Sequence, residues 1–124
     1  MSEADCFCST GPKLIFACSG ASDVGEIADQ TAHKLTRESA SRMYCLAEIG
    51  GRVASIVKTA KTAQSILAID GCSQSCTRHC LELAGLKDFT HLQLGGLGMD
   101  KGLSPITDDA IGRAAAAARD LLSG

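Results

Sequence analysis

The chain carries seven cysteines, and four of them have a spacing that suits a metal site. Cys18, Cys45 and Cys72 are separated by equal intervals of 27 residues (45 − 18 and 72 − 45), and Cys76 follows Cys72 by four residues. Four thiolates around Zn²⁺ form a closed tetrahedral site, with Zn–S distances of about 2.3 Å. The residue types and the spacing therefore predict a zinc site at Cys18, Cys45, Cys72 and Cys76.

Two other interpretations of these cysteines stay open. Four thiolates also hold iron–sulfur clusters, which the sequence does not distinguish from zinc. A free cysteine also behaves as a small hydrophobic residue, so that Cys18 and Cys45 would then be ordinary buried strand residues. Among the other cysteines, we expect Cys80 to be buried in the core, and we expect Cys6 and Cys8 to lie in an exposed tail.

Four strand-like segments must position these thiols, and each is followed by a helical pattern. The strand-like segments are residues 13–18, 42–46, 65–70 and 89–94. The helical patterns run from Asp23, over residues 53–60, from Ser73 or Ser75 to Gly85, and onward from the capping residue Thr107. Asp23 followed by Glu26 resembles a capping box for the first helix.

This alternation of strands and helices predicts the fold. We expect a tail over residues 1–12 and a single three-layer α/β domain over residues 13–124, with a parallel four-stranded sheet flanked by helices. Right-handed crossovers leave few topologies, and a flavodoxin-like or Rossmann-like sheet with strand order 2-1-3-4 is the one we prefer. Because the cysteines are equally spaced, each then lies at the same position in its strand–helix unit, namely at the carboxyl edge of the sheet. Open α/β sheets bind ligands at that edge.

The residues around these cysteines resemble a known family, the DGC-domain proteins, which take their name from a sequence found here as Asp70-Gly71-Cys72. The similarity extends to the segments Cys18–Ala21, Met43–Leu46 and Leu97–Lys101. The resemblance implies zinc binding through the same four cysteines, and it implies no particular activity. Because four protein ligands leave no open position on the metal, we expect a structural or regulatory role for the zinc rather than a catalytic one.

A thiol enzyme is the alternative to a zinc protein. Residues 72–78 fit the pattern Cys-x5-Arg of phosphatase and arsenate-reductase loops, in which Cys72 would be the nucleophile and Arg78 would hold an oxyanion. A redox protein would instead pair Cys72 with Cys76 or Cys80. No residue is assigned as catalytic, and no partner is identified for the three histidines, His33, His79 and His91.

The composition excludes other classes of function. The formal net charge is −2 and aromatic residues make up 3% of the chain, which is unsuited to nucleic-acid binding. No apolar run reaches the length of about 20 residues that a membrane helix needs. The first residues are acidic, where a secretory signal is basic, so we expect a cytoplasmic protein whose thiols stay reduced.

Overall fold

All four strands of the sheet are parallel and lie in the order β2-β1-β3-β4. The computed structural model describes residues 12–123. The elements, in chain order, are β1 (Lys13–Ala17), α1 (Asp23–Arg37), β2 (Arg42–Met43), α2 (Leu46–Gly50), α3 (Ala54–Lys61), β3 (Ser65–Asp70), α4 (Cys76–Leu83), β4 (Thr90–Gln93), the 3-10 helix η2 (Leu94–Leu97) and α5 (Asp108–Ser123). The predicted α/β class and the predicted strand order are confirmed.

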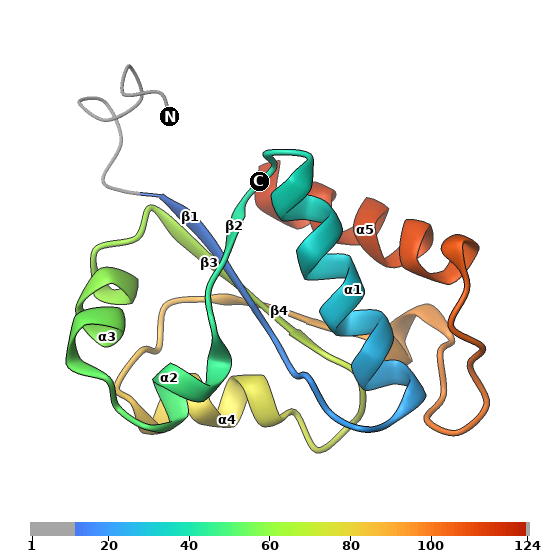
Figure 1. The fold of residues 1–124 in the computed structure, drawn as a ribbon, viewed down its shortest axis with the longest axis horizontal. Helices are drawn as coiled ribbons and strands as arrows, with labels where there is room; N and C mark the ends of the chain where they lie inside the picture. Colours follow the sequence, from blue (N-terminus) through green and yellow to red (C-terminus); the bar gives the residue numbers. More distant parts are fainter. Residues whose placement is uncertain (1–11, 124) are drawn as a thin grey trace.

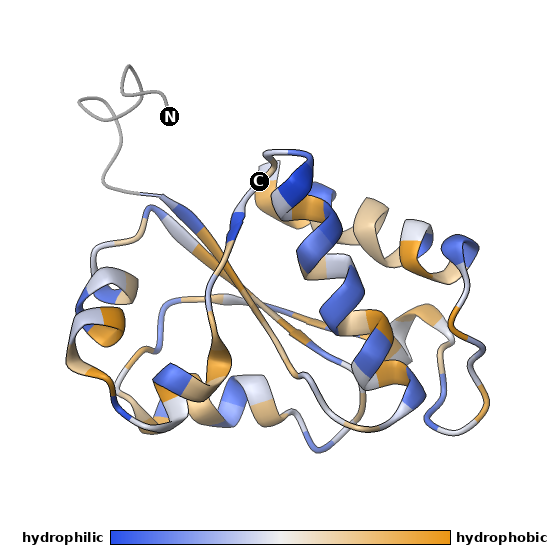
Figure 2. Ribbon diagram, viewed as in Figure 1, coloured by the Kyte–Doolittle hydropathy of each residue, from blue (hydrophilic) through white to orange (hydrophobic). Residues whose placement is uncertain are grey.

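Helices cover both faces of the sheet. Helices α1 and α5 lie on one face, and α2, α3 and α4 lie on the other (Figure 1). Strands β1 and β3 are apolar between their end residues, where both of their faces are covered (Figure 2). No helix among residues 12–123 combines the length and the apolar character needed to span a bilayer.

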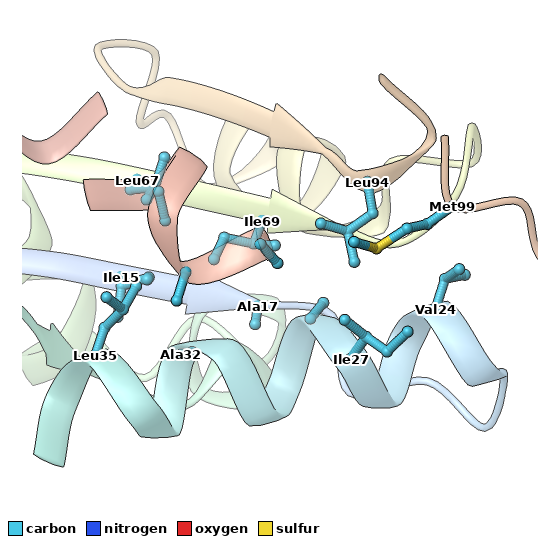
Figure 3. Close-up of a cluster of buried hydrophobic side chains, with 14 of the residues drawn as sticks. Ile15, Ala17, Val24, Ile27, Ala32, Leu35, Leu67, Ile69, Leu94 and Met99 are labelled. Carbon is cyan, nitrogen blue, oxygen red and sulfur yellow. The ribbon is translucent and has the colours of Figure 1, made fainter. Parts of the chain in front are cut away.

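Alternate residues of the central strands build two cores. Ile15 and Ala17 of β1 face α1 and α5, where Ile69 of β3 joins them (Figure 3). Leu14 and Phe16 face the opposite side, in the core under α2, α3 and α4. This burial on both sides fixes the register of β1 between β2 and β3, and with it the positions where the strands end.

The second strand is shorter than predicted and is followed by a helix that the sequence analysis missed. Pairing in β2 ends at Met43, and Cys45 is the N-cap of α2 rather than a strand residue. The prediction of a strand through Leu46 was wrong. Leu46 and Ile49 have helical spacing, and both pack into the second core, so this segment is helical. Strand β4 likewise ends one residue early, at Gln93, because Leu94 turns into η2.

The first helix is capped one residue earlier than predicted. The Ser22 hydroxyl accepts a hydrogen bond from the amide N–H of Gly25, at 3.0 Å, so Ser22 is the N-cap. The Asp23 carboxylate is free for another contact, described below. The predicted cap of the last helix is correct, since the Thr107 hydroxyl accepts the amide N–H of Ala110 at 3.1 Å.

Candidate functional site

The carboxyl edge of the sheet collects the cysteines. Cys18 directly follows β1, and Cys45, the N-cap of α2, lies two residues after β2. Cys72 follows β3 after a single glycine, and Cys76 is the first residue of α4, which starts at the same edge (Figure 1). All five cysteines of the described residues are free thiols. The tail cysteines Cys6 and Cys8 lie outside the described residues.

Cys18 makes the contact that links two strand ends. Its Sγ accepts a hydrogen bond from the amide N–H of Gly71, at 3.2 Å, across 53 residues of sequence. Burial raises the pKa of the Cys18 thiol, and the negative charges of Asp70 and Cys76 act in the same direction, against the lowering by the Gly71 N–H. Cys18 is therefore close enough to the turn after β3 to respond to the charges there.

The other thiols differ in exposure. Cys72 is partly buried against the first core, whereas Cys45 and Cys76 are exposed. Cys80 packs against the second core, and burial, followed by the charge of Cys76, raises the pKa of its thiol. In residues 12–123, no three His, Cys, Asp or Glu side chains stand in an arrangement that holds a metal ion. The cysteines thus share one edge of the sheet without closing around a common centre.

Asp70, the last residue of β3, is the buried acid of this edge, with 1% of its surface exposed. Its carboxylate accepts the amide N–H of Thr77 at 2.7 Å and that of Arg78 at 3.1 Å. The third partner is His91 Nε2, at 2.8 Å from Asp70 Oδ2. His91 has no role that the sequence predicts, and no spacing rule joins residues 70 and 91, because their contact depends on the pairing of β3 with β4.

These contacts do not support a phosphatase-like loop at residues 72–78. Such a loop cradles an oxyanion with the backbone amides at the start of the following helix. Here the amides of Thr77 and Arg78 point at the Asp70 carboxylate, which occupies the position of the anion. The pattern Cys-x5-Arg is present in the sequence, but the amides of Thr77 and Arg78 already donate to Asp70 and are not available to an oxyanion.

The loop between η2 and α5 is held against the start of α1. The Asp23 carboxylate accepts the amide N–H of Gly102 and that of Ser104, each at 2.9 Å. Lys101, the last residue of the family-like segment Leu97–Lys101, is exposed on this loop. Asp23 therefore links the loop to the helix that follows Cys18.

The Asp23 contact predicts a response of this loop to acid. The two backbone hydrogen bonds lower the pKa of Asp23 below its ordinary value of 3.8. The ionised Asp23 carboxylate therefore contributes its full stabilisation when the pH is above the ordinary pKa. This stabilisation is lost as the pH falls through the lowered pKa of the folded state. We expect Asp23→Ala to speed hydrogen exchange of the Gly102 and Ser104 amides already at neutral pH.

Asp108→Ala is the control for this prediction. Asp108 also lies in the first turn of a helix, so this variant removes a comparable carboxylate from the start of α5. We expect it to leave the exchange of the Gly102 and Ser104 amides unchanged. Equal exchange rates in Asp23→Ala and the wild type, measured by NMR, would show that the carboxylate does not hold the loop.

The fold and the edge define a class of protein, namely a parallel α/β domain with cysteines collected where its strands end. The chain belongs to the DGC domain family, whose model matches residues 14–118. It is also similar to the anaerobic and virulence modulator AnvM of Pseudomonas aeruginosa, with 38% identity over 88 residues, a match that covers 71% of this chain and 67% of the relative. No solved structure matches the chain.

Proposed function

We propose that the protein is a regulatory zinc-binding domain in which Cys18, Cys45, Cys72 and Cys76 hold one Zn²⁺. The observation that carries this proposal is the hydrogen bond from the Gly71 N–H to Cys18 Sγ at 3.2 Å. It brings the thiol at the end of β1 to the turn that precedes Cys72. Two of the four proposed ligands are thereby near each other through backbone positions that the sheet fixes.

The other two ligands would have to turn toward this pair. Cys45 and Cys76 are exposed, so their side chains are free of the packing that holds a core residue in one rotamer. Each also lies at the start of a helix, at the edge of the sheet where Cys18 and Cys72 lie. Zinc binding would thus order exposed side chains on a fixed backbone.

A divalent cation would also suit the charge of this edge. Zinc ligands bind as thiolates, so loading the site places four negative charges near the buried Asp70 carboxylate. At Cys18 itself, the charged groups that act on the pKa of the thiol are Asp70 and Cys76, both negative, whereas the cationic Arg52 acts on Cys80. Zinc, when bound, would supply the missing positive charge and cross-link the strand ends.

A regulatory role follows from the ligand count and from the relative. Four cysteine ligands leave zinc without an exchangeable position, which is typical of structural sites rather than catalytic ones. The name of the Pseudomonas relative describes a modulator. We therefore propose that the metal state of this edge, rather than turnover of a substrate, is what the domain contributes.

Metal analysis of the freshly purified full chain tests the proposal. We expect about one zinc per chain, and less than about a tenth of that in Cys18→Ser or Cys45→Ser, because a closed site loses most of its affinity with a ligand. Cys80→Ser is the matched control, since it removes a neighbouring thiol outside the proposed set. We expect full zinc content in this variant.

Other outcomes would reject the proposal in distinguishable ways. Metal-free protein with a reactive Cys72 would indicate the thiol enzyme instead. Visible absorption from sulfur-to-iron charge transfer would indicate an iron–sulfur cluster. Zinc lost on Cys80→Ser but kept on Cys45→Ser would show that the ligand set is wrong.

A further inference from the structure

Two side chains of strand β4 contact the turn that follows β3 and carries Cys72. His91 and Gln93 are two residues apart, so they project from the same face of the sheet. In the register of β3 with β4, Gln93 is the partner of Asp70 and His91 is the partner of Ala68, which places all four on the face covered by α4. His91 reaches the Asp70 carboxylate at 2.8 Å, and Gln93 Nε2 donates to the carbonyl oxygen of Cys72 at 3.0 Å.

The turn is closed by a hydrogen bond from the Ser75 N–H to the Cys72 carbonyl oxygen, at 3.1 Å, but the helix after it begins without the usual side-chain cap. Ser75, the N-cap of α4, adopts a left-handed conformation with φ of 50°, which non-glycine residues disfavour, and its side chain makes no capping hydrogen bond. The Asp70 carboxylate does the capping instead, through the amides of Thr77 and Arg78. The start of α4, and with it the position of Cys76, therefore depends in part on where Asp70 is held.

His91 is well placed to hold Asp70. An ionised carboxylate only accepts hydrogen bonds, so His91 donates through its Nε2–H. Asp70 is buried, and a buried carboxylate that loses a donor is left partly unsatisfied. Without His91, Asp70 Oδ2 keeps only the Arg78 amide, at 3.1 Å, and the carboxylate is held from the α4 side alone, by this amide and that of Thr77.

We propose that His91 is a positioning residue, which, together with Gln93, fixes the turn from Asp70 to Ser75 and so sets where the Cys72 and Cys76 thiols stand. His91 acts through Asp70 and contacts no proposed ligand itself. Its effect on zinc rests on the proposed function of the same edge. Its effect on the turn does not, so the two are tested separately.

The test compares three variants of the full chain with the wild type. His91→Ala removes the donor, and His91→Gln restores one at a position close to Nε2. His33→Ala is the matched control, because His33 also faces an aspartate, Asp29 at 3.6 Å, but on the outer face of α1. Circular dichroism checks that each variant folds.

The first readout is independent of metal. In metal-free protein, we expect His91→Ala to speed hydrogen exchange of the Thr77 and Arg78 amides by about tenfold, as the loss of a hydrogen bond to a charged group implies. The alkylation rates of Cys72 and Cys76, followed by mass spectrometry, should differ between His91→Ala and the wild type, whereas the alkylation rate of Cys45 should not. His91→Gln should restore both, and His33→Ala should change neither.

The second readout is zinc affinity, measured by competition with a chromophoric chelator. Residues that orient ligands typically contribute about tenfold or more to metal affinity, so we expect about a tenfold loss in His91→Ala and recovery in His91→Gln. Wild-type protein without zinc affinity would reject the proposed function and leave the first readout to decide the role of His91. Unchanged amide exchange and alkylation in His91→Ala would overturn the positioning role itself.

Discussion

Replacing Gly71 with alanine is expected to destabilise the domain by about 3 kcal/mol, at the upper end of the usual cost of overpacking. A Cβ at this position would lie 2.7 Å from both the carbonyl carbon and the oxygen of Val24, and 2.9 Å from the backbone nitrogen of Gly25. These are backbone atoms at the start of α1, so a rotamer change cannot relieve the clash. The helix and the turn after β3 would have to separate.

Thermal unfolding measures this effect. For a domain of this size, a loss of about 3 kcal/mol lowers the midpoint of unfolding by roughly 10 °C. Gly112→Ala is the control, because its added Cβ meets no heavy atom within 4 Å and Gly112 lies inside α5. We expect that variant to be more stable than wild type by about 0.5 kcal/mol, since alanine favours the helix.

The same substitution bears on the cysteines. The Gly71 amide donates to Cys18 Sγ, so moving the turn away from α1 also disturbs this hydrogen bond, while the Cys18 N–H still pairs with the carbonyl oxygen of Ile69. Glycine in the Asp-Gly-Cys segment is therefore explained by close approach of two backbones. A Gly71→Ala protein as stable as the wild type would show that this close approach is absent in solution.

Zinc is expected to be the other large contribution to stability. A ligand that binds only the folded state stabilises it by about 4 kcal/mol when its free concentration is 1,000 times its Kd. We therefore expect the unfolding midpoint of the wild-type chain to rise by more than about 10 °C under such conditions. A chelator should reverse the change, and Cys18→Ser should show almost none of it.

The zinc effect should also depend on pH in one direction. The ligands bind as thiolates, so protons compete with the metal, and the zinc-induced rise should shrink as the pH is lowered. A rise of equal size from neutral to strongly acidic solution would argue against thiolate ligation. An equal rise in Cys18→Ser and wild type would show that zinc binds elsewhere.

The parts of the fold that follow from repetition were predictable from sequence. Apolar strands alternating with amphipathic helices leave few arrangements for a parallel sheet, and the order β2-β1-β3-β4 is the predicted one. Because all the strands run the same way, residues such as Cys18 and Cys72 that follow them must share one edge. The grouping of the cysteines therefore needed only the fold class.

The contacts that organise this edge were not predictable in the same way. Helix α2 was missed because its five residues are too few to show a clear period, and Cys45 was consequently placed in a strand. Asp23 was interpreted as a cap, whereas it binds a loop some 80 residues later. His91 meets Asp70 only through the register of two strands, which no local pattern specifies.

An anomalous difference map at the zinc absorption edge, from crystals of the full chain, would locate the bound metal and its ligands. We predict a single strong peak per chain at the carboxyl edge of the sheet, within about 2.3 Å of the Sγ atoms of Cys18, Cys45, Cys72 and Cys76. A map without such a peak in zinc-supplemented crystals, or a peak bound by other side chains, would contradict the account.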